Sequence, residues 1–326
     1  MITSALAIAA LLLLSIVTPA TAHTDHGPDL GIARILAPAT GQAADVDDGV
    51  DAALAGQRYP WAFPRSTVDR PDEKVGRQIH VIYLVPAAAP DDHYDTLGVL
   101  EDSLRSMNHW MRQQTGNQQW SLDTYTFRPE GSSEPVNAID VTFVASDKVQ
   151  SQLGSVSAVQ GELEARGFDD PNKRYLSYVA ANAGGVCGDA WYPLDPSPTE
   201  VDGKYADVYL YSSEGCNPRD FATSPTEPSH VEATAMQELI HNDGMVPLVA
   251  PHDCLVSLLA FGHVCTGPLW ASDVVGQGLD PERFDVMYPY VGVPLGEKKL
   301  DEDHLDYYRH LAPYRDLEQG LYLETV

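Results

Sequence analysis

A short segment near residue 240 carries the residue types that metal-dependent hydrolysis requires. From residue 235 to residue 244 it reads Ala-Met-Gln-Glu-Leu-Ile-His-Asn-Asp-Gly. In the zinc-binding pattern H-E-x-x-H, two histidines lie on one helical face, and the glutamate beside the first activates a metal-bound water. Here Glu238 and His241 are in place, and Gln237 stands where the first histidine would be. The segment therefore predicts a metal-site helix with one ligand exchanged.

Gln237 changes what this helix can bind. On a helix, Gln237 and His241 are one turn apart and face the same way, while Glu238 points about 100° aside. Catalytic zinc keeps three protein ligands and one open position, and a glutamine amide oxygen is a weaker ligand than imidazole. Either Gln237 binds through its amide oxygen, or a histidine from elsewhere completes the site. Gly244, three residues past His241, suits a sharp turn out of the helix.

Two histidines downstream are the candidates for further ligands. His252 lies in the sequence Pro-His-Asp-Cys, and His263 lies in the sequence Gly-His-Val-Cys. A bridge between Cys254 and Cys265 would hold the two histidine loops together. We rank His252 above His263, because the adjacent Asp253 offers a carboxylate that could orient the ring.

The cysteines indicate disulfides rather than a metal site. The chain has four: Cys187, Cys216, Cys254 and Cys265. An even number in an exported chain favours disulfides, and no C-x-x-C pair suggests a cysteine zinc site. Three connectivities are possible, of which the pairing of sequence neighbours, 187 with 216 and 254 with 265, is the simplest.

The order of these features resembles a known family. E-x-x-H-x-x-G is followed by a histidine loop and then by Phe-Asp-Val-Met-Tyr at residues 284–288. This order resembles the metzincin clan of zinc metallopeptidases, in particular secreted members of actinobacterial type, over roughly residues 77 to 310. The resemblance implies a zincin-like fold with a twisted mixed sheet, an active-site helix and an irregular C-terminal part. It also implies zinc as cofactor, Glu238 as general base and Met287 as the apolar floor beneath the metal.

The chain departs from the family pattern at three positions. Gln237 replaces the first ligand, and Pro247 stands where the third histidine would be, so the third ligand must come from a longer loop. Asp243 places a negative charge at the helix end, where the helix dipole disfavours it. Two functions follow as expectations: hydrolysis of protein or peptide substrates, or a catalytically silent relative that binds or supports other molecules outside the cell.

The elements around this segment alternate between strands and helices. The sequence predicts strands and helices from apolar periodicity, and it favours an α/β or α+β sandwich. The predicted strands are Ile79–Val85, Ser121–Phe127, Ile139–Val144, Arg174–Ala180 and Asp207–Tyr211, and the predicted helices are Tyr94–Gln114, Ser155–Arg166 and the helix that carries Glu238.

The N-terminal part is interpreted as export and processing sequence. Residues 1–22 have an apolar run followed by Ala20 and Ala22, as in a signal peptide with an A-x-A cleavage site. Residues 23–75 are rich in Ala, Asp, Gly and Pro and are expected to be a flexible extension or propeptide. Residues 76–326 then form the folded domain.

The net charge of the chain makes large negatively charged molecules poor binding partners. The formal charge is −27, from 20 basic and 47 acidic side chains. Such a charge argues against binding to nucleic acid or to an anionic membrane. It suits a soluble secreted protein, whose oligomeric state the sequence leaves open.

Overall fold

The computed structural model describes the greater part of the chain after residue 58. The described residues are 30–36, 59–193, 203–212, 216–244, 246, 250–254, 262–265, 284–289, 292–301, 305–312 and 314–326. The expected signal peptide, residues 1–22, and Pro247 lie outside these ranges.

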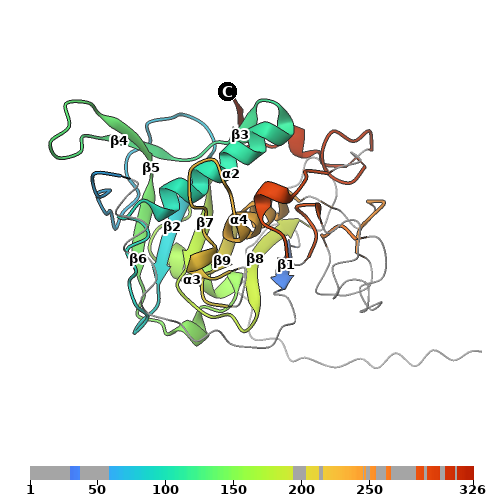
Figure 1. Cartoon of the computed structure of the whole chain (residues 1–326). Helices are drawn as coiled ribbons and strands as arrows, with labels where there is room; N and C mark the ends of the chain where they lie inside the picture. The colour runs from blue at the N-terminus through green and yellow to red at the C-terminus, as the bar shows by residue number, and fades with distance from the viewer. Residues whose placement is uncertain are drawn as a thin grey trace, which may run out of the picture.

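A mixed β-sheet forms the centre of the molecule (Figure 1). The strand order is β8-β9-β7-β2-β6, and β1 pairs along the free side of β8. Strands β6, β2, β7 and β9 are parallel, whereas β8 runs antiparallel to both β9 and β1. The bounds are β1 Leu30–Leu36, β2 Gln78–Val85, β6 Val141–Ala145, β7 Lys173–Val179, β8 Val186–Pro193 and β9 Tyr205–Tyr209.

Three α-helices of the described chain cover the two faces of this sheet. Helices α2 (Val99–Thr115) and α4 (His230–Asn242) share one core with alternate residues of β2, among them Val81 and Tyr83. Helix α3 (Val156–Glu164) packs on the opposite face, with Ile82 and Leu84. Because successive strand residues point to opposite faces, both sides of β2 are buried. The predicted α/β or α+β architecture with a mixed sheet is confirmed.

Two small sheets flank the central one. Strand β3 (Gln118–Trp120) pairs antiparallel with β10 (Leu323–Thr325), so the C-terminal end of the chain lies beside the end of α2. Strand β4 (Thr124–Phe127) pairs antiparallel with β5 (Val136–Ile139). Among the described residues, no helix is both long and apolar enough to cross a membrane.

Several predicted boundaries shift for identifiable reasons. The helix predicted from Tyr94 begins at Val99, because Gly98 adopts a left-handed conformation with φ of 80°. The strand predicted over Ile139–Val144 is divided between β5 and β6 at Asp140, whose carboxylate binds the backbone N–H of Arg70 at 3.0 Å. Strand β8 was not predicted, because its sequence lacks a run of apolar residues.

Part of the expected flexible extension is packed against the domain. Residues Leu30–Leu36 form β1. Further along, Phe63 is buried, and the Arg65 guanidinium binds the carboxylates of Asp91 and Asp95 at 2.5 and 2.6 Å. Order in the chain therefore begins before Ile79, where the apolar pattern first becomes regular.

Candidate metal centre

Helix α4 carries the predicted metal-site segment. The backbone N–H of Ser229 donates to the Glu232 carboxylate at 2.7 Å, which caps the first turn. At the other end, Gly244 has φ of 73° and its N–H donates to the carbonyl of His241 at 2.8 Å, so the chain leaves the helix there as expected. The Arg174 guanidinium binds the Asp243 carboxylate at 2.7 Å and balances the charge that the helix dipole disfavours.

His241 and His263 face each other in the protein interior. Their Nε2 atoms are 3.3 Å apart, the ring centroids are 4.7 Å apart, and the rings are nearly perpendicular at 74°. Both side chains are fully buried. Burial, followed by the proximity of His263, lowers the pKa of His241 well below its usual range. His241 is therefore neutral, which is the form that binds a metal ion.

The separation of these nitrogens matches the geometry of a zinc site. Zinc–nitrogen bonds of about 2.0–2.1 Å with a tetrahedral angle place two ligand nitrogens about 3.3–3.4 Å apart. The observed Nε2 separation of His241 and His263 is 3.3 Å. Two neutral imidazoles that share one N–H···N hydrogen bond would lie at a similar distance. The pair thus fits two zinc ligands, and metal content distinguishes the two arrangements.

The His263 loop is held by the second disulfide. Cys254 and Cys265 are bridged, with Cα atoms 5.4 Å apart. On either side of the bridge, the N–H of Cys254 donates to the carbonyl of His263 at 3.0 Å, and the N–H of Cys265 donates to the carbonyl of His252 at 2.9 Å. Both histidine loops are therefore fixed side by side, as predicted from the cysteine pairing.

His252 has a different partner from the one its sequence suggests. Its Nδ1 is hydrogen-bonded to Oδ2 of Asp306 at 2.9 Å, and its backbone N–H donates to Oδ1 of the same residue at 2.9 Å. The adjacent Asp253 instead accepts from the N–H of Gly262 at 3.3 Å. Asp306, distant in sequence, thus orients the ring, and the described contact with His241 is made by His263, the histidine ranked second.

Met287 lies in a turn that is hydrogen-bonded both to α4 and to the His263 loop. The Met287 N–H donates to Oδ1 of Asp285 at 2.7 Å, and the Met287 carbonyl accepts from the N–H of Val264 at 3.0 Å. Nε2 of Gln237 donates to the carbonyl of Tyr288 at 3.2 Å. This bond ties the exchanged ligand position on α4 to the turn that carries Met287. The Met287 side chain is fully buried.

Buried polar contacts to Asp285 hold the turn in place. Lys298 Nζ donates to the backbone carbonyl of Asp285 at 2.9 Å, and the hydroxyl of Tyr307 donates to Oδ1 of Asp285 at 2.9 Å. Burial raises the pKa of the Asp285 carboxyl and lowers the pKa of the Lys298 ammonium. These contacts position the turn without any contribution from a metal ion.

Glu238 lies against the sheet. Its carboxyl packs on Gly188 of β8, so closely that a Cβ at position 188 would collide with Oε1. Glu238 is fully buried, and neither oxygen has a hydrogen-bond partner among the described residues. Burial, then the charges of Asp189 and Asp207, raise the pKa of Glu238 well above its usual range. In this arrangement Glu238 is a neutral carboxylic acid.

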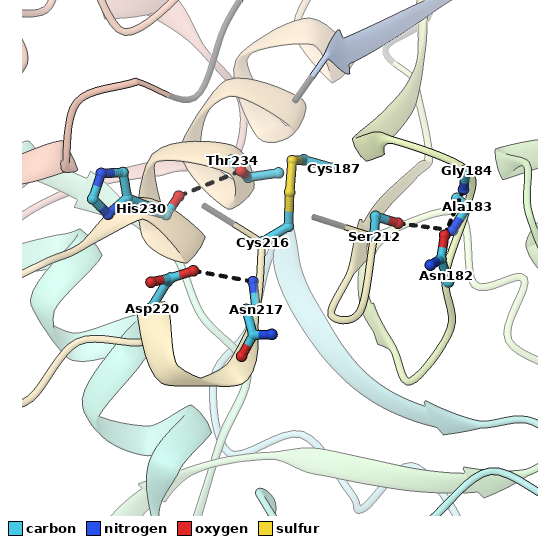
Figure 2. The surroundings of a disulfide bond; sticks show 10 residues. All are labelled: Asn182, Ala183, Gly184, Cys187, Ser212, Cys216, Asn217, Asp220, His230 and Thr234. Carbon is cyan, nitrogen blue, oxygen red and sulfur yellow. Dashed lines mark hydrogen bonds between the residues drawn. A yellow bond between two sulfur atoms is a disulfide. The ribbon is translucent and has the colours of Figure 1, made fainter. Parts of the chain in front are cut away.

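The first disulfide anchors β8 beside α4. Cys187 and Cys216 are bridged, with Cα atoms 5.4 Å apart, and Figure 2 shows the bridge next to the first turns of α4. In those turns the hydroxyl of Thr234 donates to the carbonyl of His230 at 3.3 Å. Cys187 directly precedes Gly188, so the bridge fixes the strand residue that contacts Glu238. Both predicted cysteine pairings are confirmed, and disulfides are typical of an oxidising, extracellular-type environment.

A second group of side chains could also hold a metal ion. Ligand atoms of Asp69, His80, Asp123 and Asp140 all lie within 4.8 Å of one another. The Lys173 ammonium, however, already binds Asp69 at 2.7 Å and Asp123 at 2.8 Å, so a metal ion would have to displace it. No spacing in the sequence indicated this group, and its one signal is His80, a polar residue within the apolar run of β2.

Comparison with known proteins gives no assignment. No protein-family profile matches this chain, and no curated protein matches it.

Proposed function

We propose that this chain is a secreted, metzincin-like zinc metallopeptidase scaffold. The observation that carries the proposal is the pair His241 and His263, whose Nε2 atoms are 3.3 Å apart. Two imidazole nitrogens at this separation suit a zinc ion. Gln237 lies one helical turn before His241 and is the third donor of the proposed site.

Each part of the proposed site has support that is independent of metal. The Cys254–Cys265 bridge holds the His263 loop, and the Asp285 turn contacts Val264 through Met287. Gln237 binds the carbonyl of Tyr288 in the same turn. A site built in this way can bind zinc without a large rearrangement, which reduces the free-energy cost of ordering its ligands.

Zinc, when bound in such a site, polarises a peptide carbonyl and lowers the pKa of its water to about 7. In this proposal His241 and His263 hold the metal, and Glu238 accepts a proton as general base. Glu238 must then lose its own proton and gain access to water, because a general base acts within hydrogen-bond reach of the proton it abstracts. The substrate class is protein or peptide.

A catalytically silent relative is the second candidate, and a specific observation favours it. Glu238 is fully buried against Gly188, and burial raises its pKa well above the usual range. Together with Gln237 in place of an imidazole, this arrangement suits a protein that retains the scaffold as an extracellular binding or structural module.

A cleavage assay separates the two candidates. The purified mature chain would be incubated with a mixed peptide library, with added zinc and with a chelator, beside Glu238→Gln. The peptidase proposal expects cleavage that zinc supports and that both the chelator and Glu238→Gln abolish. Cleavage that persists in Glu238→Gln contradicts the role of Glu238. If the wild-type chain binds zinc but cleaves no peptide, the silent relative is the correct description.

A further inference from the structure

We propose that a pocket between α2, β3 and β10 binds a small organic carboxylate. The pocket has a volume of about 340 Å³, and its lining includes Lys74, Arg105, Arg112, Trp120, Leu122 and Glu324. This volume lies within the range of roughly 300–1,000 Å³ found for small-molecule sites. None of the candidate metal-centre residues lines this pocket.

The charge of the pocket is opposite to that of the molecule. The lining contains three cationic side chains, Lys74, Arg105 and Arg112, against one carboxylate, Glu324. The whole chain carries a formal charge of −27, with only 20 basic residues among 326. A pocket that gathers cations on such a protein attracts an anion locally. The overall negative charge repels a polyanion such as a nucleic acid, so a compact monoanion is the better fit.

Among the three cations of the pocket, Arg112 is the one that can bind the carboxylate of a ligand. The Arg105 guanidinium binds Glu101 at 2.5 Å, and the Lys74 ammonium binds Glu324 at 3.1 Å. Arg112 donates from Nη1 to the neutral amide oxygen of Gln119, and within the described part of the chain it forms no ion pair. A guanidinium presents a planar fork of donors that matches a carboxylate in bidentate geometry.

The apolar side chains of the pocket favour a carboxylate that also has an apolar body. Leu122 and Ile139, which are 5% and 4% exposed, are the apolar lining residues that a ligand can touch, and Trp120 is fully buried and supports the lining. Trp120 is also held in place, because its backbone N–H and carbonyl both bind the Asn108 side chain at 3.0 Å and its indole N–H donates to Sδ of Met236 at 3.1 Å. A preformed apolar wall beside a guanidinium suits an anion with an aromatic or aliphatic body.

The test uses 3-phenylpropionate as the probe, measured by isothermal titration calorimetry on the full purified chain after metal removal over a chelating resin. Metal removal excludes any contribution from the proposed zinc site, so failure here is separate from failure there. We expect the carboxylate to bind at least tenfold more tightly than its neutral amide, 3-phenylpropionamide. Equal affinities for acid and amide would overturn the proposal. If inorganic phosphate binds as tightly as 3-phenylpropionate, the claim that the pocket prefers an organic anion is wrong.

Variants assign the binding to the pocket. Arg112→Gln should weaken the binding of 3-phenylpropionate at least tenfold, and Arg112→Lys should weaken it less, because lysine keeps the charge and loses the fork. The matched control is Arg128→Gln, which makes the same change of charge at an exposed residue outside the pocket. The proposal expects the control to bind as wild type does. An equal loss in Arg128→Gln, or none in either Arg112 variant, contradicts it.

Discussion

The Nε2 atoms of His241 and His263 lie 3.3 Å apart, although the two residues come from a helix and from a disulfide-bridged loop. Both rings are fully buried. Burial and mutual proximity keep the pKa of His241 low, so the ring is neutral without a metal ion. His241 therefore meets the protonation requirement of a zinc ligand before any zinc is bound.

Gln237→His should increase the affinity for zinc at least tenfold. The substitution replaces a weak amide ligand by an imidazole on the helical face that already carries His241. Affinity is measured by competition with a chromophoric chelator. Part of the gain is offset, because the hydrogen bond from Gln237 to the carbonyl of Tyr288 is lost.

Gln152→His is the control for this variant. Gln152 is exposed on a short 3-10 helix, and the change adds a histidine without altering α4. We expect its zinc affinity to equal that of wild type. If Gln237→His also leaves the affinity unchanged, Gln237 is not in a ligand position.

Gly188→Ala should destabilise the protein by about 1–3 kcal/mol, the usual cost of forcing extra atoms into a packed core. The added Cβ would collide with Oε1 of Glu238, and both residues are confined between α4 and β8. Urea denaturation measures the change in the free energy of unfolding.

Gly161→Ala provides the matched control, since a Cβ at this helical position meets no atom within 4 Å. It should be neutral, or stabilising by up to about 1 kcal/mol, because alanine favours the helix. The double variant Gly188→Ala with Glu238→Ala should recover much of the lost stability. Additive losses in the double variant would show that the contact between the two residues is not the cause.

Asp207→Asn should flatten the dependence of stability on pH. Asp207 lies directly opposite Asp189 in the sheet, and both are fully buried. Burial, then the charge of Asp189, raise the pKa of Asp207 well above its usual range. The folded chain thus keeps a proton that the unfolded chain releases above about pH 4, so stability falls as pH rises, by up to about 1.4 kcal/mol per pH unit.

The measurement is urea denaturation between about pH 4.5 and pH 7 for wild type and Asp207→Asn, with Asp147→Asn as the control at an exposed aspartate. Relative to wild type, Asp207→Asn should gain stability as pH rises, and Asp147→Asn should not. A constant difference between wild type and Asp207→Asn across the range would mean that Asp207 titrates normally in the folded state.

The local features of the site could be predicted from the sequence. The helix around Glu238, the turn at Gly244 and the pairing of Cys254 with Cys265 depend on short-range spacing, and all three are observed. Apolar periodicity also predicted β2, α2, α3, β7 and β9 within a few residues.

The long-range partners could not be predicted. Asp306 orients His252 from 54 positions away, and nothing in the intervening sequence indicates the contact. The contact between Gly188 and Glu238 depends on how α4 packs across β8, a strand without an apolar pattern. The ranking of His252 above His263 rested on a neighbour in sequence, whereas the fold brings His263 to His241.

Whether His241 and His263 hold a metal ion is tested most directly by the zinc content of the purified chain, measured by elemental analysis after dialysis against trace zinc without chelator. His241→Ala is measured alongside, with His109→Ala as the control for loss of a histidine outside the proposed site. We predict close to one zinc per chain in wild type and in His109→Ala, and close to none in His241→Ala. Wild-type protein without zinc would contradict it, and the pair of histidines would then be a shared N–H···N hydrogen bond.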